Sequence, residues 1–198
     1  MSAVENTLEL PSPLSEWLAP LSAFLDREQI RALKAGVCAP EAMPQPYRRL
    51  LAHQKDMTST LEGFHKVVLR VHANQVKKID GDYWREVTLR CLAHENPAEY
   101  GIIRIHVDRL DEAGQKLALD GKVPFGAILN GLKIPYKSEP SGFFWLDSIP
   151  EIEKALDMES PARLWGRRNT LSQPDGEPLA EILEILPPME ETSCETDD

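Results

Sequence analysis

Arg85 is the residue whose setting most clearly indicates chemistry. It lies in residues 83–92, where apolar and polar residues alternate as they do in a strand with one buried face. On that strand Arg85 shares a face with the more apolar residues Val87, Leu89 and Cys91. A guanidinium group directed into a core needs an anion as its partner. The alternation leaves open whether that anion is a protein carboxylate or a ligand carboxylate, or whether Arg85 reaches water at a strand end.

A second arginine cluster follows a glycine in the motif Trp165-Gly166-Arg167-Arg168. Successive residues of a strand face opposite sides, so only one of the two arginines can face a given pocket. Gly166 would allow a ligand to approach the backbone closely. The pattern alone favours a plainer interpretation, in which the strand is exposed and its arginines offset nearby acidic residues.

Two glutamates, Glu181 and Glu184, interrupt the apolar stretch 178–186. Residues three apart on a strand face opposite sides, so at most one of these glutamates points inward. An inward glutamate near an arginine would suit acid–base chemistry or the binding of a hydroxyl group. The alternative is that both lie at a sheet edge, where charges discourage aggregation.

Motifs for metals, nucleotides or covalent catalysis are missing from the sequence. The five histidines and three cysteines have no zinc-site spacing, and there is no GxSxG, P-loop or GxGxxG. We therefore expect neither a metal nor an organic cofactor. The cysteines form no CxxC pair and no disulfide framework, which favours a reducing compartment.

The elements that must position these residues begin with helices. Apolar residues at helical spacing predict a helical segment over 13–35, with a break at Pro20. The proline-rich segment 38–46 should be irregular, and either Asp56 or Thr58 could cap the next helix.

Strands dominate after residue 66. Alternating patterns over 66–72, 83–92 and 100–108, joined by short polar connections, predict an antiparallel meander. Further on, we predict helices over 111–119 and 124–129, a short helix over 149–157, and strands over 141–146, 164–171 and 178–186. The fold class predicted is α+β, with one antiparallel sheet of five or six strands and helices covering one face.

Length and charge restrict the function classes. The chain has 198 residues, enough for one domain of ordinary size, and a net charge of −10. Such a charge disfavours non-specific binding of nucleic acid or of an anionic membrane. The segment 187–198 holds five acidic and no basic residues, which predicts a disordered tail. The chain has no signal-peptide pattern and no run of about 18 apolar residues, so we expect a cytosolic protein.

Several motifs, taken in order, resemble the chorismate lyase family, the chorismate–pyruvate lyases that form 4-hydroxybenzoate. They are Asp56-Met57-Thr58, Tyr83-Trp84-Arg85-Glu86, Pro124-Phe125-Gly126, Leu164-Trp165-Gly166-Arg167-Arg168, and Gly176-Glu177-Pro178-Leu179 followed by Glu184 and Pro188. The resemblance implies an N-terminal helical extension over 1–55, a chorismate lyase-like domain over 56–188 and a disordered acidic tail over 189–198. It also implies a six-stranded antiparallel sheet whose helical flaps enclose the ligand.

The resemblance assigns ligand contacts near the flaps and on the sheet. Met57 and Phe125 match positions where the family contacts its aromatic acid through the backbone, although Phe125 stands where the family has leucine. Arg85 matches the arginine that holds the ring carboxylate, in agreement with the inward position that the strand pattern favours.

The remaining implied contacts lie on the last two strands. Glu184, with Glu181 as the alternative, matches the glutamate that accepts a hydrogen bond from the hydroxyl group and assists proton movement. One of Arg167 and Arg168 would neutralise the enolpyruvyl carboxylate of chorismate.

The implied function is a lyase that eliminates pyruvate from chorismate or a close analogue, with no metal or organic cofactor. The alternative is a non-catalytic binder of a small aromatic carboxylate, because the ligand-binding domains of a class of bacterial transcription regulators share this fold. A fused DNA-binding unit is not expected, since residues 1–55 contain no basic helix-turn-helix pattern.

The expected partner is a small aromatic or dicarboxylate ligand, not nucleic acid or a membrane. A scaffold without any ligand remains the third alternative, and the sequence does not predict the oligomeric state.

Overall fold

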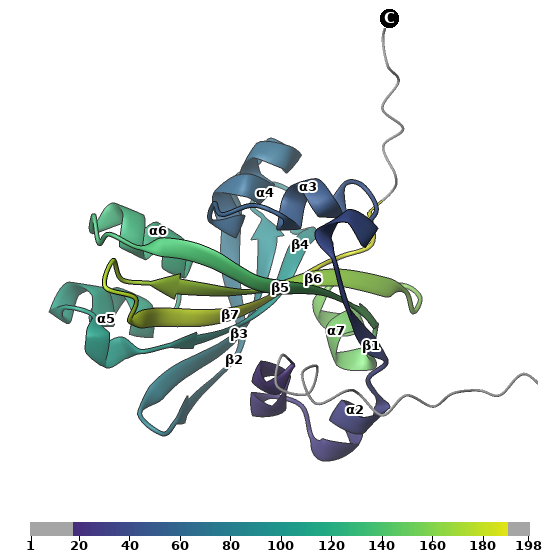
Figure 1. Cartoon of the computed structure of the whole chain (residues 1–198), viewed down its shortest axis with the longest axis horizontal. Coiled ribbons are helices and arrows are strands. Elements are labelled where there is room, and N and C mark those ends of the chain that lie inside the picture. Colours follow the sequence, from purple (N-terminus) through teal and green to yellow (C-terminus); the bar gives the residue numbers. More distant parts are fainter. Residues whose placement is uncertain (1–17, 190–198) are drawn as a thin grey trace, which may run out of the picture.

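Seven antiparallel strands form one sheet in the computed structural model of the chain, which describes residues 18–189 (Figure 1). The order across the sheet is β1-β5-β6-β7-β4-β3-β2. The strands are β1 (Ala35–Cys38), β2 (Leu69–Ile79), β3 (Asp82–Cys91), β4 (Pro97–Ile105), β5 (Lys137–Asp147), β6 (Arg163–Ser172) and β7 (Pro178–Leu186). The α+β class and the single antiparallel sheet are confirmed.

The six-stranded sheet was wrong by one strand, because β1 adds to the edge next to β5. This short strand lies within the N-terminal part that we expected to be helical, and Gly36 pairs with Trp145 in it. A Cβ atom on Gly36 would lie 2.6 Å from the Trp145 indole nitrogen. Only a glycine lets the strand approach the indole this closely. The segment is too short to show the alternation of apolar residues that predicts a strand, but this close packing lets it pair with β5.

The predicted meander is formed by β2, β3 and β4, and its first turn is tight. Asp80 and Gly81 both have positive φ angles, 51° and 90°, which are typical of the two-residue hairpin turn that matches strand twist. The turn fixes the register in which Arg85 lies opposite Val76 on β2, while on its other side Arg85 pairs with Ile103 on β4.

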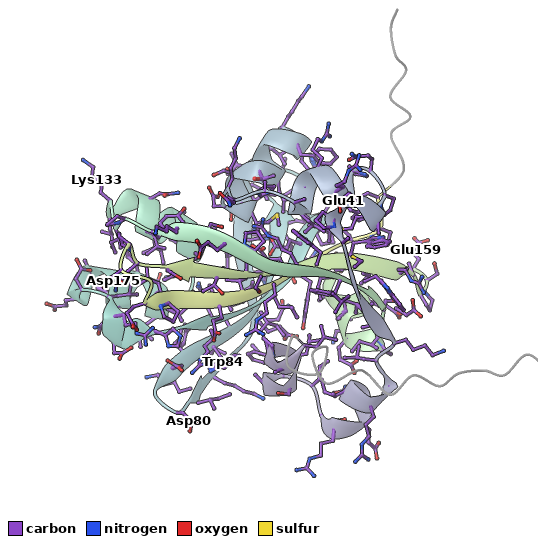
Figure 2. All side chains as sticks on the ribbon, viewed as in Figure 1. Glu41, Asp80, Trp84, Lys133, Glu159 and Asp175 are labelled. Carbon is purple, nitrogen blue, oxygen red and sulfur yellow. The ribbon has the colours of Figure 1, made fainter. Side chains whose placement is uncertain are left out.

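Helices cover both faces of the sheet, and not one face as predicted. One face carries α3 (Tyr47–Leu51), α4 (Met57–His65), α5 (Glu112–Asp120) and α6 (Phe125–Gly131), and the other carries η1 (Ala19–Ala23), α2 (Arg27–Ala32) and α7 (Pro150–Ala155). Two short 3-10 helices, η2 (Pro40–Ala42) and η3 (Val107–Arg109), lie in connections. The central strands have residues buried on both sides, so each face needs its own apolar cover. Trp84 marks the face that carries η1 and α2 (Figure 2).

Aspartate caps begin three of the helices, among them α4, whose first residues line the site. Asp56 is the N-cap of α4, and its carboxylate accepts a hydrogen bond from the Ser59 amide at 2.8 Å. Asp26 and Asp111 cap α2 and α5 in the same way. The short side chain of aspartate at this position satisfies amide groups that have no partner within the helix.

No helix between residues 18 and 189 is both long and apolar enough to cross a membrane.

Residues 1–55 do more than extend the domain. The described part of this segment supplies β1 to the sheet, and η1 and α2 pack into the core of the face opposite α4. The predicted disordered tail falls on residues 189–198, of which all but Met189 lie outside the described residues, as does the beginning of the helical segment predicted over 13–35.

Substitution of Leu21 tests whether the N-terminal segment is integral to the fold. Leu21 is fully buried against the sheet, so Leu21→Ala should lower the free energy of unfolding by about 2–5 kcal/mol in urea titrations. The matched control, Leu119→Ala on α5, removes a side chain that is 41% exposed and should change it by about 0.5 kcal/mol or less. Equal effects of the two substitutions would contradict this packing.

Candidate functional site

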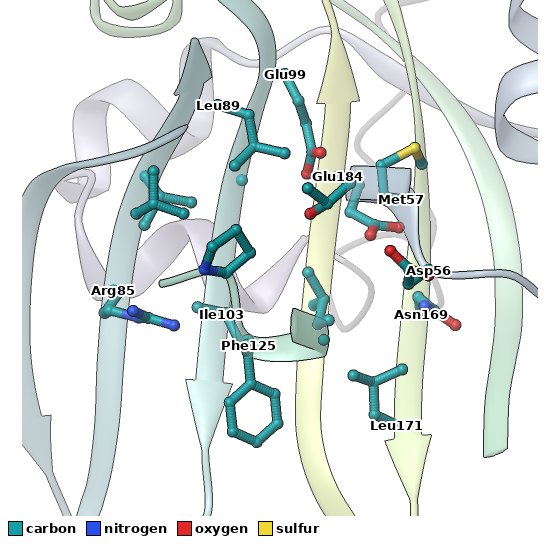
Figure 3. A pocket seen from close by; sticks show the side chains of 17 residues that line it. Asp56, Met57, Arg85, Leu89, Glu99, Ile103, Phe125, Asn169, Leu171 and Glu184 are labelled. Atoms are coloured by element: carbon teal, nitrogen blue, oxygen red, sulfur yellow. The ribbon is translucent and has the colours of Figure 1, made fainter. Parts of the chain in front are cut away.

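A cavity of about 70 Å³ lies between the sheet and the first residues of α4 and α6 (Figure 3). Its floor consists of side chains from the central strands, and its roof is formed by residues at the two helix starts. The residues that line it are Asp56, Met57, Thr58, Val71, Arg85, Val87, Leu89, Glu99, Gly101, Ile103, Pro124, Phe125, Gly126, Asn169, Leu171, Ile182 and Glu184. The walls are mainly apolar, with few polar groups, as in typical small-molecule sites.

Arg85 enters this cavity from β3 as a buried cation. Its side chain is 1% exposed, and neither Nε nor Nη1 has a hydrogen-bond partner among residues 18–189. No ion pair in the described part of the chain includes it. Burial lowers the pKa of the Arg85 guanidinium, and the Tyr83 hydroxyl opposes that effect weakly. The inward position predicted from the strand pattern is therefore observed, without a protein carboxylate to match it.

Arg167 is buried as deeply as Arg85, but its hydrogen bonds are satisfied. Its Nε donates to Glu184 Oε2, and its Nη1 donates to the backbone carbonyl oxygens of Leu51 at 3.1 Å and His53 at 2.8 Å. The side chain thus neutralises Glu184 and fastens the connection between α3 and α4 to the sheet. Arg167 supports the site and does not itself line the cavity.

Glu99 on β4 is a pocket residue that the sequence analysis missed. It is 4% exposed, and its Oε2 has no hydrogen-bond partner within the described region. Burial raises the pKa of Glu99 well above the usual carboxyl range, the negative charge of Glu184 raises it further, and Arg167 lowers it in part. Its carboxyl group lies close to that of Glu184 in Figure 3. The signal was available, because Glu99 has the same strand parity as Ile103 and Ile105, but the predicted strand began at residue 100.

The structure separates the remaining predicted site residues into two groups. Met57, Phe125 and Glu184 all line the cavity together with Arg85. Arg168 and Glu181 lie on the opposite face of the sheet, where the Arg168 Nη2 and Glu181 Oε1 atoms are 3.4 Å apart.

Glu181 also has a closer cationic partner, since Arg104 Nη1 lies 3.0 Å from its Oε2. Strand parity thus decides the choice left open by the sequence, because Glu184 faces the cavity and Glu181 does not. Arg168 and Glu181 therefore face away from this cavity, contrary to the ligand contacts predicted for them.

Gly166 also differs from its predicted use. A Cβ atom at this position would lie 2.5 Å from Cζ of Phe144 and 2.5 Å from the Glu184 carbonyl oxygen. The space above Gly166 is therefore occupied by the Phe144 ring in the core of the far face, and not left open for a ligand.

The roof of the cavity closes where two helix starts meet. A Cβ atom on Gly126 of α6 would lie 3.4 Å from Cβ of Asp56, the cap of α4. Pro124 and Phe125 on one side and Met57 and Thr58 on the other complete the roof. Within residues 18–189, no cluster of three or more histidine, cysteine or carboxylate residues could hold a metal ion.

Comparisons with known proteins give distant structural likenesses. No protein-family model and no curated protein matches the chain. A "possible transcriptional regulator", YydK from Bacillus subtilis, is similar with 11% identity and a TM-score of 0.47, over 60% of this chain and 57% of that one. The chain thus spans less than two thirds of YydK.

Two regulators of the GntR family are similar to the same extent. One is a ligand-binding domain described as belonging to a GntR-family transcriptional regulator of Bordetella bronchiseptica, with 11% identity and a TM-score of 0.44 over 60% of this chain and 90% of that one. The other is a GntR-family regulator of Enterococcus faecalis, with 10% identity and a TM-score of 0.42 over 59% and 91%. At these values the likenesses carry no argument about function, which has to come from the cavity itself.

The two buried arginines should respond oppositely to replacement by leucine. Arg167→Leu leaves Glu184 buried without its cation, so the free energy of unfolding should fall by about 3–5 kcal/mol. Arg85→Leu removes a buried charge that has no protein partner, so stability should stay the same or rise by about 1 kcal/mol. Urea unfolding of both variants measures the difference. A loss at Arg85 as large as that at Arg167 would show that Arg85 serves the fold.

Proposed function

We propose that this protein binds a small aromatic carboxylate in the cavity, with Arg85 as the anchor for the carboxylate group. One observation carries the proposal: a buried guanidinium faces an apolar cavity with two nitrogen atoms unpartnered among the described residues. An unpaired buried charge costs stability, so a fold retains it where a ligand supplies the counter-charge. A carboxylate matches the planar donor geometry of arginine and forms a charge-assisted pair.

The apolar side chains that line the cavity beyond Arg85 suit an aromatic ring. Val87, Leu89 and Ile103 rise from the floor, and Phe125 and Leu171 flank the same space. These side chains offer apolar surface without hydrogen-bonding groups, so they suit a flat hydrocarbon body that joins two polar ends.

Binding must enlarge the cavity. A cavity that accommodates benzene in an engineered protein core measures about 150 Å³, whereas the cavity here is about 70 Å³. The floor belongs to a sheet that is packed on both faces, so the additional space must come from separation of α4 and α6 at the roof.

Calorimetric titration with 4-hydroxybenzoate tests the anchor. The protein should bind this acid, and Arg85→Met should weaken binding by about 2–5 kcal/mol, which is a loss of roughly 30-fold or more. Methionine keeps most of the side-chain volume while it removes the charge. The matched control is Arg168→Met, which changes an arginine of the opposite face and should leave the affinity unchanged. Absence of binding to the unaltered protein would refute the proposal.

A lyase acting on chorismate is the second candidate, and the carboxyl pair favours it. Glu184 is held as a carboxylate by Arg167, whereas burial and the neighbouring charge of Glu184 raise the pKa of Glu99. A carboxylate paired with an arginine, next to a carboxyl group whose pKa is raised, suits the roles of base and acid. Glu184 would take the ring proton, and Glu99 would protonate the departing enolpyruvate as the carbon–oxygen bond breaks. The products would be pyruvate and 4-hydroxybenzoate.

Incubation with chorismate distinguishes an enzyme from a binder. Pyruvate and 4-hydroxybenzoate should be followed separately, since another aromatic product would still release pyruvate. If the protein is a lyase, Arg85→Ala should abolish turnover while the melting temperature stays largely unchanged. Binding of 4-hydroxybenzoate without release of pyruvate from chorismate would support the non-catalytic binding function and exclude the lyase.

A further inference from the structure

We infer that Glu99 keeps its proton inside the cavity and donates a hydrogen bond to an acceptor oxygen at the end of the ligand opposite Arg85. The cavity would then select a monoanionic acid with such an acceptor and reject a second carboxylate. This inference rests on the proposed binding function and deepens it, because it names which aromatic acids bind; it disfavours chorismate, which carries two carboxylates, and so speaks against the second candidate. Glu99 acts here as a specificity-determining residue.

The position of Glu99 brings two carboxyl groups together. Gly101, two residues further along β4, lies opposite Glu184 of β7. A Cβ atom on Gly101 would be 3.2 Å from Glu99 Oε1, so the carboxyl group of Glu99 lies over this glycine and toward Glu184. The absence of a side chain at Gly101 makes room for this arrangement.

A single guanidinium group serves this pair. Arg167 donates its Nε hydrogen to Glu184, and its Nη1 hydrogens go to the carbonyl oxygens of Leu51 and His53. Glu99 receives no hydrogen bond from Arg167 or from any other described residue at its Oε2. One cation can neutralise one of two adjacent buried carboxylates, so the other is held neutral by a proton.

Other charged groups near Glu99 do not change this balance. Asp56 in the roof uses its carboxylate to cap α4. Burial and the charge of Arg167 lower the pKa of His53, which favours its neutral form. Arg85 is rooted four residues from Leu89, the β3 residue that pairs with Glu99, which is roughly 13 Å along the strand. The raised pKa of Glu99 agrees with this arrangement.

The charges on the floor of the cavity therefore sum to one positive unit, while the carboxylate of Asp56 in the roof is held by an amide group at the start of α4. Arg167 and Glu184 cancel, Glu99 is neutral, and Arg85 remains. A ligand with one carboxylate balances that charge. A second carboxylate next to Glu99 and Glu184 would be desolvated without a cation, whereas a carbonyl, ether or hydroxyl oxygen could accept the Glu99 proton in a hydrogen bond.

Three acids of similar width test the inference by calorimetry at pH 6.5: benzoate, 4-formylbenzoate and terephthalate. The formyl oxygen can accept a hydrogen bond but cannot donate one, so it reports on a protonated Glu99. We expect 4-formylbenzoate to bind about three- to tenfold more tightly than benzoate, and terephthalate to bind at least about 100-fold more weakly than 4-formylbenzoate.

Variants assign the effect to Glu99. Glu99→Gln keeps a donor of the same shape and should retain the preference for 4-formylbenzoate within about threefold, whereas Glu99→Leu should remove it. Glu181→Gln on the opposite face is the matched control and should bind all three acids as the unaltered protein does. Circular dichroism and melting temperature confirm that each variant is folded, and the acids are then compared within that variant.

The pH dependence gives an independent readout. The neutral form of Glu99 binds and its pKa is raised, so affinity for 4-formylbenzoate should hold at low pH and fall as the pH rises through that pKa. The fall should reach about tenfold per pH unit above the pKa. Glu99→Gln cannot ionise and should bind equally across the same range.

An ionised Glu99 would give the opposite pattern. In that case 4-formylbenzoate would bind more weakly than benzoate, and the Glu99→Gln variant would bind 4-formylbenzoate more tightly than the unaltered protein does. The pH dependence of the affinity would also be lost. Any one of these results overturns the inference. If the acids bind equally and Arg85→Met weakens them all, the inference fails but the proposed function stands. If none of the acids binds, the proposed function itself fails.

Discussion

The need to neutralise charge inside the apolar interior determines how this site is built. Arg167 and Glu184 are fully or nearly buried, and each would destabilise the fold without the other. Their pairing lets β6 and β7 carry charged residues in the middle of the sheet, and the remaining donors of Arg167 hold the connection that leads to the cap of α4. The roof of the cavity thus depends on an ion pair in its floor. Arg85 is buried as deeply but has no ion-pair partner among residues 18–189, and the proposed binding function depends on that difference.

Much of the fold could be predicted because its signals are local. Alternation of apolar residues located the meander, and residue type limited the cap of α4 to Asp56 or Thr58, of which Asp56 is the cap. The seventh strand could not be predicted, because four residues that include a glycine are too few to show alternation, and β1 forms by pairing with β5, which is distant in sequence. The helices on the second face were missed because strands buried on both sides no longer alternate clearly.

The candidate site was predictable only as far as strand parity reaches. Parity placed Arg85 inward and allowed only one of Glu181 and Glu184 into the cavity, and the resemblance to chorismate lyases favoured Glu184. Parity could not show that Arg167 pairs with Glu184, because that pairing depends on the register between β6 and β7. Glu99 was overlooked because β4 begins at Pro97, before the clear alternation starts.

The double packing of the sheet has a consequence for ligand selection. Arg85 and Glu99 are both rooted in a floor that is braced from behind by η1, α2 and α7, so the separation between them is fixed. The roof consists of two short helix starts that meet at Asp56 and Gly126. If an acid binds as we propose, the fixed floor would limit its length strictly, whereas differences in its thickness would be accommodated at the roof.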